Sequence, residues 1–280
     1  MNIAHHRVNV GRLSLHVAEV GQGPAVLCLH GFPAYWADFR EQMLALAGAG
    51  FRVIAPDLPG YAESDKLSDT LAYRSTLLAD DLAGLIQALG LKSAHVIGHD
   101  WGGTLAYCLA SQHAPLVERL VILNAGHPEL FRLALRHPAQ LVKSWYMFLF
   151  QLPWLPEWLV RRRSVLALAL RGMLVRKAAM PDAELDGYLS AMRTPGAARS
   201  AVSYYRAAFR VPVRAKRTVS QETLVLWGER DTALSAPLLL TGLPEYVPRV
   251  RVERFQEAGH WIHRDLPEVV NQRLIAFFQS

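Results

Sequence analysis

A glycine-rich turn between an apolar run and a helical pattern constrains the fold of this chain more than any other stretch. The run Ala94–Ile97 predicts a buried strand, and the spacing in Thr104–Ala110 predicts a helix. The turn Gly98–Gly103 lies between them, with Asp100 at its centre. A sharp strand-to-helix turn presents its central side chain at the carboxyl end of a sheet, and small neighbours let the helix pass close to the strand. The stretch therefore predicts an exposed, reactive carboxylate at Asp100.

The residue type at position 100 decides which chemistry such a turn supports. Serine is the usual residue there, and it serves acyl transfer. A carboxylate instead attacks alkyl carbon and leaves an ester on the enzyme, whereas it is a poor acylating nucleophile. The alternative is that Asp100 only caps the helix that follows it. The glycines on both sides of the aspartate favour the nucleophile.

Apolar runs alternate with helical patterns along most of the chain, and this order predicts an α/β fold with a mostly parallel sheet covered by helices on both faces. Besides the run before Asp100, strands are predicted at residues 12–20, 25–29, 52–55, 120–124, 222–228 and 250–255. Helices are predicted at about residues 36–47, 71–89 and 267–278.

The segment 130–217 interrupts this alternation, because it holds only helical or irregular patterns punctuated by prolines. It lies between two predicted core strands. We therefore expect a helical lid over the carboxyl edge of the sheet, where open α/β sheets bind ligands. The predicted organisation is a core formed by residues 1–129 and 218–280, with residues 130–217 as the lid.

Composition limits the cellular context. The chain has 280 residues, and 51% of them are hydrophobic, which is enough for a sizeable core. No apolar run is long enough to span a bilayer, and residues 1–9 show no signal-peptide pattern. Cys28 and Cys108 do not make a disulfide framework and are expected to be small core residues. A cytoplasmic protein is the simplest expectation.

An ester on Asp100 can be cleaved only if a base activates water and a second acid orients that base. The chain order nucleophile, acid, histidine is typical of this architecture. His260 follows the last predicted strand and is the predicted base, whereas His263 lies further into the approach to the last helix. Asp231 follows the penultimate strand and is the predicted orienting acid, with Glu229 as the alternative.

The negative charge that develops during ester cleavage needs hydrogen-bond donors. The turn after the nucleophile supplies the backbone N–H of Trp101, and the loop after the strand 25–29 supplies that of Phe32. The pair His30–Gly31 permits the turn that brings the second N–H round, and a cis bond before Pro33 would hold it there.

Four motifs together resemble the epoxide hydrolases of the α/β-hydrolase fold: His30–Pro33, Gly98–Gly103, Gly228–Asp231 and Gly259–Trp261. The resemblance covers essentially the whole chain and implies an α/β-hydrolase fold and an enzyme that needs no cofactor and no metal. A departure occurs in the loop Gly60–Ser64, where an alanine replaces a glycine of the family pattern. The predicted substrate contacts in or near these motifs are His30, Pro33, Trp36 and Trp261.

Haloalkane and fluoroacetate dehalogenases share the aspartate and the histidine. Residues of the lid must therefore distinguish an epoxide hydrolase from a dehalogenase. An epoxide that opens to an alkoxide needs a hydrogen bond or proton at its oxygen, and the family uses two lid tyrosines for this. Tyr146 and Tyr205 stand at the matching places, whereas Tyr204 is expected to pack the lid. The rival interpretations are an aromatic packing stripe, a dehalogenase, and a hydrolase-fold protein that only binds a small ligand.

The lid is strongly basic. The chain carries a net charge of +6, yet residues 132–217 hold 16 basic and four acidic side chains, a net of +12. No nucleic-acid-binding motif accompanies this block, so nucleic acid is not an expected partner. Either the arginines only solvate the lid, or the lid face makes weak contact with an anionic membrane or guides an acidic lipid inward. Both interpretations predict a bulky hydrophobic epoxide as substrate. The expected assembly is a monomer or a homodimer.

Overall fold

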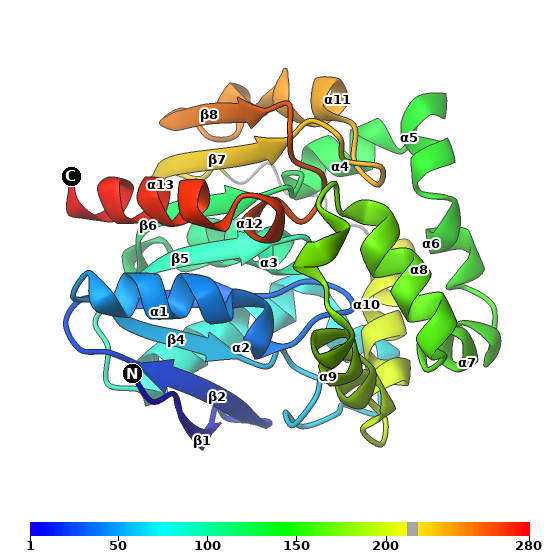
Figure 1. The fold of residues 1–280 in the computed structure, drawn as a ribbon, viewed down its shortest axis with the longest axis horizontal. Coiled ribbons are helices and arrows are strands. Elements are labelled where there is room, and N and C mark those ends of the chain that lie inside the picture. Colours follow the sequence, from blue (N-terminus) through cyan, green and yellow to red (C-terminus); the bar gives the residue numbers. More distant parts are fainter. Residues whose placement is uncertain (212–217) are drawn as a thin grey trace.

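The computed structural model describes residues 1–211 and 218–280, and it contains one eight-stranded sheet in the order β1-β2-β4-β3-β5-β6-β7-β8 (Figure 1). The pairs β1–β2 and β2–β4 are antiparallel, and all other neighbours are parallel. The predicted α/β-hydrolase fold class is confirmed. The strands are β1 (Ala4–Asn9), β2 (Ser14–Val20), β3 (Ala25–Leu29), β4 (Arg52–Pro56), β5 (Ala94–His99), β6 (Val117–Leu123), β7 (Glu222–Gly228) and β8 (Val250–Phe255).

The sequence patterns predict every strand except β1. All five residues of β3 and all six of β5 are buried, which matches continuous apolar runs in strands that are covered on both faces. In contrast, β1 is the edge strand and none of its residues is fully buried. Its sequence is polar, so nothing in the apolar pattern indicates it.

Helices cover both faces of the sheet. The helices α1 (Arg40–Gly48) and α13 (Pro267–Gln279) pack together on the face that is in front in Figure 1. The helices α2 (Ser75–Ala88) and α3 (Trp101–Gln112) cover the opposite face. Two predicted helices begin as 3-10 turns, because η1 (Trp36–Phe39) precedes α1 and η2 (Thr70–Tyr73) precedes α2. The remaining core elements are η3 (Ala114–Leu116), α11 (Ala236–Leu240), η5 (Leu243–Glu245) and α12 (Ile262–Asp265).

Only helices occur in the described chain between β6 and β7, and they gather beyond the carboxyl ends of the parallel strands (Figure 1). They are α4 (Pro128–Ala134), α5 (Pro138–Lys143), α6 (Trp145–Leu149), α7 (Leu155–Val160), α8 (Arg163–Met173), η4 (Lys177–Ala179), α9 (Asp182–Arg193) and α10 (Ala197–Arg210). We call this segment the lid. The last basic residues predicted for it, Arg214, Lys216 and Arg217, lie outside the described residues.

Membrane-spanning helices are not found among the described residues, since none of their helices is long and apolar enough to cross a bilayer.

Candidate active site

Asp100 occupies the sharp turn between β5 and α3. Its backbone has φ 51° and ψ −120°, a conformation that only a tight turn imposes on a residue with a side chain. Neighbouring backbone and side-chain atoms lie so close to this turn that two positions have room only for glycine. A Cβ on Gly102 would lie 2.0 Å from the carbonyl oxygen of Leu29, and one on Gly31 would lie 2.4 Å from Cβ of Asp100. The turn therefore holds the Asp100 carboxylate at the carboxyl edge of the sheet, with 17% of its side chain exposed.

The Asp100 carboxylate is held as an anion. The backbone N–H of Phe32 donates to its Oδ1 at 2.8 Å, and Nε2 of His260 lies 3.5 Å from its Oδ2. Burial alone would raise the pKa of Asp100, but His260 and the Phe32 amide outweigh burial and lower it. One predicted oxyanion donor therefore already points at the reactive carboxyl group. The other, Trp101, is the first residue of α3, directly beside it.

The loop after β8 carries His260, and the loop after β7 carries its partner Asp231. The Nδ1 atom of His260 lies 2.8 Å from Oδ2 of Asp231. That oxygen also accepts a hydrogen bond from Nδ2 of Asn124 at 2.8 Å, while Oδ1 accepts from the backbone N–H groups of Ala233 and Leu234. Asp231 is thus fixed from four directions. Sequence analysis names Asp231 but does not indicate that Asn124 orients it.

The charge of His260 depends on its two carboxylate neighbours. Burial would lower the pKa of His260, but Asp231 and Asp100 outweigh burial and raise it to about 10. The imidazole is therefore protonated at neutral pH while both carboxylates are charged. Removing the charge on Asp100 lowers the pKa again, because an opposite charge nearby is what favours the imidazolium.

This coupling predicts that Asp100→Asn lowers the pKa of His260 by roughly 1–3 pH units, the shift expected when one nearby opposite charge is lost. Nitrogen-15 NMR of the imidazole across a pH titration measures the change. Thr104→Ala is the matched control, because Thr104 also lines the pocket but carries no charge. An unchanged His260 titration in Asp100→Asn would contradict the assignment of Asp100 as a charge partner.

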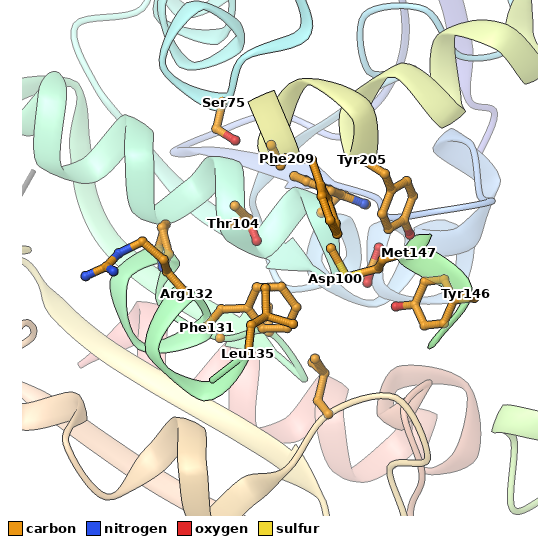
Figure 2. Close-up of a pocket in the computed structure, with 16 residues that line it drawn as sticks. Ser75, Asp100, Thr104, Phe131, Arg132, Leu135, Tyr146, Met147, Tyr205 and Phe209 are labelled. Carbon is orange, nitrogen blue, oxygen red and sulfur yellow. The ribbon is translucent and has the colours of Figure 1, made fainter. Parts of the chain in front are cut away.

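Tyr146 on α6 and Tyr205 on α10 bring two hydroxyl groups to the same carboxylate. Figure 2 shows both hydroxyls directed toward Asp100. Their ring centroids are 5.9 Å apart, and the ring of Tyr205 packs edge-on against Trp101. Burial raises the pKa of both phenols, so both remain protonated donors. Tyr204 differs, because its hydroxyl donates to the carbonyl of Pro59 at 2.8 Å and its ring is buried in the core.

A cavity of about 270 Å³ opens above Asp100 and the two tyrosines (Figure 2). Apolar side chains form most of its wall, with Arg132 at one side held by Glu129. The apolar wall residues include Phe131, Leu135, Met147, Phe209 and Leu234. The site therefore offers one carboxylate and two hydroxyl donors at the base of an otherwise hydrophobic space.

The four predicted substrate contacts do not line this cavity. His30 is buried and holds the loop instead: its Nδ1 donates to the carbonyl of Gly31, and its Nε2 accepts from the N–H of Leu58. Trp36 packs against His5, outside the pocket wall. Trp261 is fully buried below the lid, and Pro33 follows a cis peptide bond. We do not carry these four forward as substrate contacts.

The loop Gly60–Ser64 departs from the family pattern in its sequence, at Ala62. Ala62, which stands where the family has a glycine, has φ 35°. The backbone thus keeps the conformation that glycine favours, although the side chain has changed.

A second buried polar cluster lies behind His260, and sequence analysis does not predict it. Its centre is Asp38, which accepts from the hydroxyl of Tyr188 at 2.5 Å and from Nε2 of His263 at 3.0 Å. Arg264 approaches the same carboxylate at 3.6 Å. His99 lies 3.8 Å from Asp38 through Nδ1 and donates from Nε2 to the carbonyl of His260 at 3.0 Å. The cluster therefore connects the lid helix α9 with the loop that carries the predicted base.

The same loop is held by a second carboxylate. Asp265 accepts the backbone N–H of Gly259 at 2.8 Å, and it also accepts the backbone N–H of Arg176 from the lid at 2.8 Å. Two buried carboxylates, those of Asp38 and Asp265, thus connect the lid with the segment that carries His260.

The atoms of Asp38, His99 and His263 lie close enough together to hold a metal ion. Arg264 places a second cation beside this group, and Tyr188 already donates to the carboxylate. Burial would raise the pKa of Asp38, but His263, Arg264 and His99 outweigh burial and lower it. A carboxylate with a lowered pKa that accepts hydrogen bonds from Tyr188 and His263 indicates a structural role.

We therefore expect Asp38→Asn to lower the free energy of unfolding by about 3–5 kcal/mol, because removing one partner of a buried ionic cluster leaves the other charge uncompensated. Urea denaturation measures the change. Asp80→Asn serves as control, since its side chain is 54% exposed and its pair with His113 is expected to contribute about 1 kcal/mol or less. Equal effects of the two substitutions would show that the Asp38 cluster does not stabilise the fold.

Comparison with known proteins supports the fold and identifies the family. The family described as alpha/beta hydrolase fold matches residues 24–265, which defines the chain as a hydrolase-fold protein. Epoxide hydrolase 3 of Xenopus tropicalis is 36% identical over 92% of this chain and 72% of its own length. The AB hydrolase superfamily protein YfhM of Bacillus subtilis is also 36% identical, over 98% of this chain and 97% of its own length.

Among solved structures, an inhibitor complex of Bacillus megaterium epoxide hydrolase superposes with a TM-score of 0.90 at 28% identity. The superposition covers 98% of this chain and all of the other. The chain belongs to the epoxide hydrolase family of the α/β-hydrolase fold, as its motifs predict.

Proposed function

We propose that this protein hydrolyses an epoxide to a vicinal diol through an ester formed on Asp100. The observation that carries the proposal is the placement of two protonated phenols opposite one anionic carboxylate. This arrangement supplies what ring opening needs, namely a nucleophile for the ring carbon and donors for the departing oxygen.

In the first step, the hydroxyls of Tyr146 and Tyr205 hold the epoxide oxygen. A carboxylate oxygen of Asp100 attacks one ring carbon, and the bond between that carbon and the epoxide oxygen breaks. The electron pair of the broken bond stays on the epoxide oxygen, which takes a proton from a tyrosine. The product is a hydroxyalkyl ester of Asp100. The remaining tyrosinate is reprotonated from solvent before the next turnover.

Ester formation prepares the second step, because it removes the negative charge of Asp100. The pKa of His260 then falls, so the imidazolium releases its proton to solvent and the neutral imidazole is able to accept a proton from water. The resulting hydroxide attacks the ester carbonyl carbon. The backbone N–H groups of Phe32 and Trp101 receive the charge on the carbonyl oxygen. When the tetrahedral intermediate collapses, the diol leaves with the proton from His260. The carboxylic acid of Asp100 then gives its own proton back to His260, so Asp100 is an anion and His260 a cation again.

The cavity favours hydrophobic epoxides. Its wall is largely apolar, and besides the residues that the reaction uses, its polar members are Ser75, Thr104 and Arg132. A related enzyme supports this choice, because a variant of the Bacillus megaterium epoxide hydrolase was crystallised with its product (R)-3-[1]naphthyloxy-propane-1,2-diol. We infer that aryl or long alkyl epoxides are preferred over small polar ones.

A single turnover in oxygen-18 water, with enzyme in excess over an aryl epoxide, tests the mechanism. The first diol formed is expected to contain no label, because its new oxygen comes from Asp100, while the label enters the carboxylate. Diol that carries label from the first turnover would show direct attack by water. Chloride release from chloroalkanes or chloroacetate without any diol formation would instead identify a dehalogenase. If no compound is turned over, the protein would be one that only binds a small ligand.

A further inference from the structure

The lid carries nearly all of the exposed large apolar side chains of this protein. Within residues 1–211 and 218–280, fourteen such side chains are exposed, and twelve of them fall between residues 133 and 211. Three are tryptophans: Trp145 is 64% exposed, Trp154 is 83% exposed and Trp158 is 52% exposed. Tryptophan offers a large apolar area, so three of them facing solvent on one segment mark an interaction surface.

These side chains come from neighbouring helices. Figure 1 shows α5, α6 and α7 in succession along the outer edge of the lid, away from the sheet. We call this surface the outer lid face. Its apolar members are Trp145, Phe148, Leu152, Trp154, Leu155 and Trp158.

Arginines border the tryptophans of the outer lid face. Trp154 and Trp158 line a surface hollow together with Arg161, Arg162, Arg193 and Arg199. In the part of the chain that the structure describes, none of these four guanidinium groups pairs with a carboxylate. The one acid of the hollow, Glu157, is bound by Arg206 at 2.6 Å. The hollow therefore presents uncompensated positive charge beside exposed indole rings.

The outer lid face also reaches the substrate cavity. The ring of Phe148 packs edge-on against Phe209, with centroids 5.4 Å apart. Phe209 is 39% exposed and at the same time lines the cavity above Asp100. Phe148 of the outer lid face thus contacts a residue that lines the cavity.

We propose that the outer lid face docks reversibly on a bilayer that contains anionic lipid. Indole rings partition into the region between headgroups and acyl chains, and nearby arginines are attracted to a negatively charged surface. A second copy of this chain fits the face less well, because it would bring the same unpaired arginines together. The apolar path along Phe148 and Phe209 then lets a membrane-dissolved molecule pass from the bilayer into the cavity.

Vesicle sedimentation without substrate tests the docking and does not depend on the proposed reaction. The wild-type protein is expected to sediment at low salt with vesicles of phosphatidylcholine and about 30% phosphatidylglycerol, and to remain free with phosphatidylcholine alone. Each neutralised arginine should weaken the partition coefficient about fivefold. The variant Arg161→Gln/Arg162→Gln should therefore bind about 25-fold more weakly. Salt at about 1 M should release the wild-type protein.

Two matched control variants distinguish binding through the outer lid face from general effects of surface charge and exposed apolar side chains. Arg40→Gln/Lys92→Gln removes two exposed charges outside the lid and should leave the partition coefficient within about twofold of wild type. Trp154→Ser/Trp158→Ser should weaken binding strongly, whereas Leu44→Ser, at an exposed apolar residue of α1, should not.

Three results would overturn the proposal. The first is no sedimentation with anionic vesicles, and the second is equal loss of binding in the lid variants and the controls. The third is a wild-type dimer that Trp154→Ser/Trp158→Ser converts to a monomer, since a second copy would then cover the face. Circular dichroism of each variant confirms that the fold is intact.

Discussion

His260→Gln is expected to form the ester on Asp100 and then stop. Removing the base leaves the nucleophile and both tyrosines in place, so the first step proceeds while water is no longer activated. The steady-state rate should fall by several orders of magnitude. Intact-protein mass spectrometry after mixing with an aryl epoxide should show one substrate mass added, and peptide mapping should place it on Asp100.

The matched variants make this result specific. Asp100→Ala should lose turnover to a similar extent but gain no mass, because it lacks the atom that bonds to substrate. His113→Gln changes a half-buried histidine that does not line the pocket, and it should keep wild-type turnover. Normal turnover by His260→Gln would assign the base to another residue.

Tyr146→Phe/Tyr205→Phe is expected to show the opposite phenotype, with ester formation nearly abolished. Assistance by a general acid contributes roughly 10²–10⁴ in rate, and both hydroxyls are directed toward Asp100 (Figure 2). Each single substitution should slow alkylation, and the double substitution should slow it most. Rapid mixing with excess enzyme, followed by mass spectrometry, measures this step directly.

Tyr204→Phe is the matched control, because it removes the neighbouring hydroxyl, which binds the carbonyl of Pro59 instead of facing the cavity. Its alkylation rate should stay close to that of the wild type. If the double variant opens epoxides at a near-normal rate, the tyrosines do not assist ring opening. A dehalogenase with the same aspartate would then explain the site better.

The parts of the site that sequence analysis predicts are those that local rules determine. The glycine pattern around Asp100 is needed because the helix backbone passes within contact distance of β3, and such a need is visible in the sequence of the turn itself. The strand order places His260 and Asp231 after β8 and β7, so their meeting with Asp100 follows from the fold class. Their roles in catalysis remain predictions until the substitutions above are measured.

The parts that sequence analysis misses depend on contacts between distant residues. Asp38 and His263 are 225 residues apart, and nothing in the pattern around Asp38 indicates that its side chain is buried. Trp261 follows the predicted base, yet its ring turns under the lid and away from the cavity. Proximity in sequence to a reactive residue therefore does not determine which side chains face the substrate.

The buried carboxylates of Asp38 and Asp265 connect the lid with the segment that carries His260. They are therefore expected to restrict movement on one side of the lid more than on the other. A displacement of α9 would pull on Asp38 through Tyr188, and a displacement of the segment at Arg176 would pull on Asp265. Either movement would be expected to shift the backbone beside His260, the predicted base. The helix α9 and the segment at Arg176 are therefore expected to stay in place. Among the described residues, the opposite side, where α4, α6 and α10 border the cavity, has no such connection to the His260 loop through these two carboxylates.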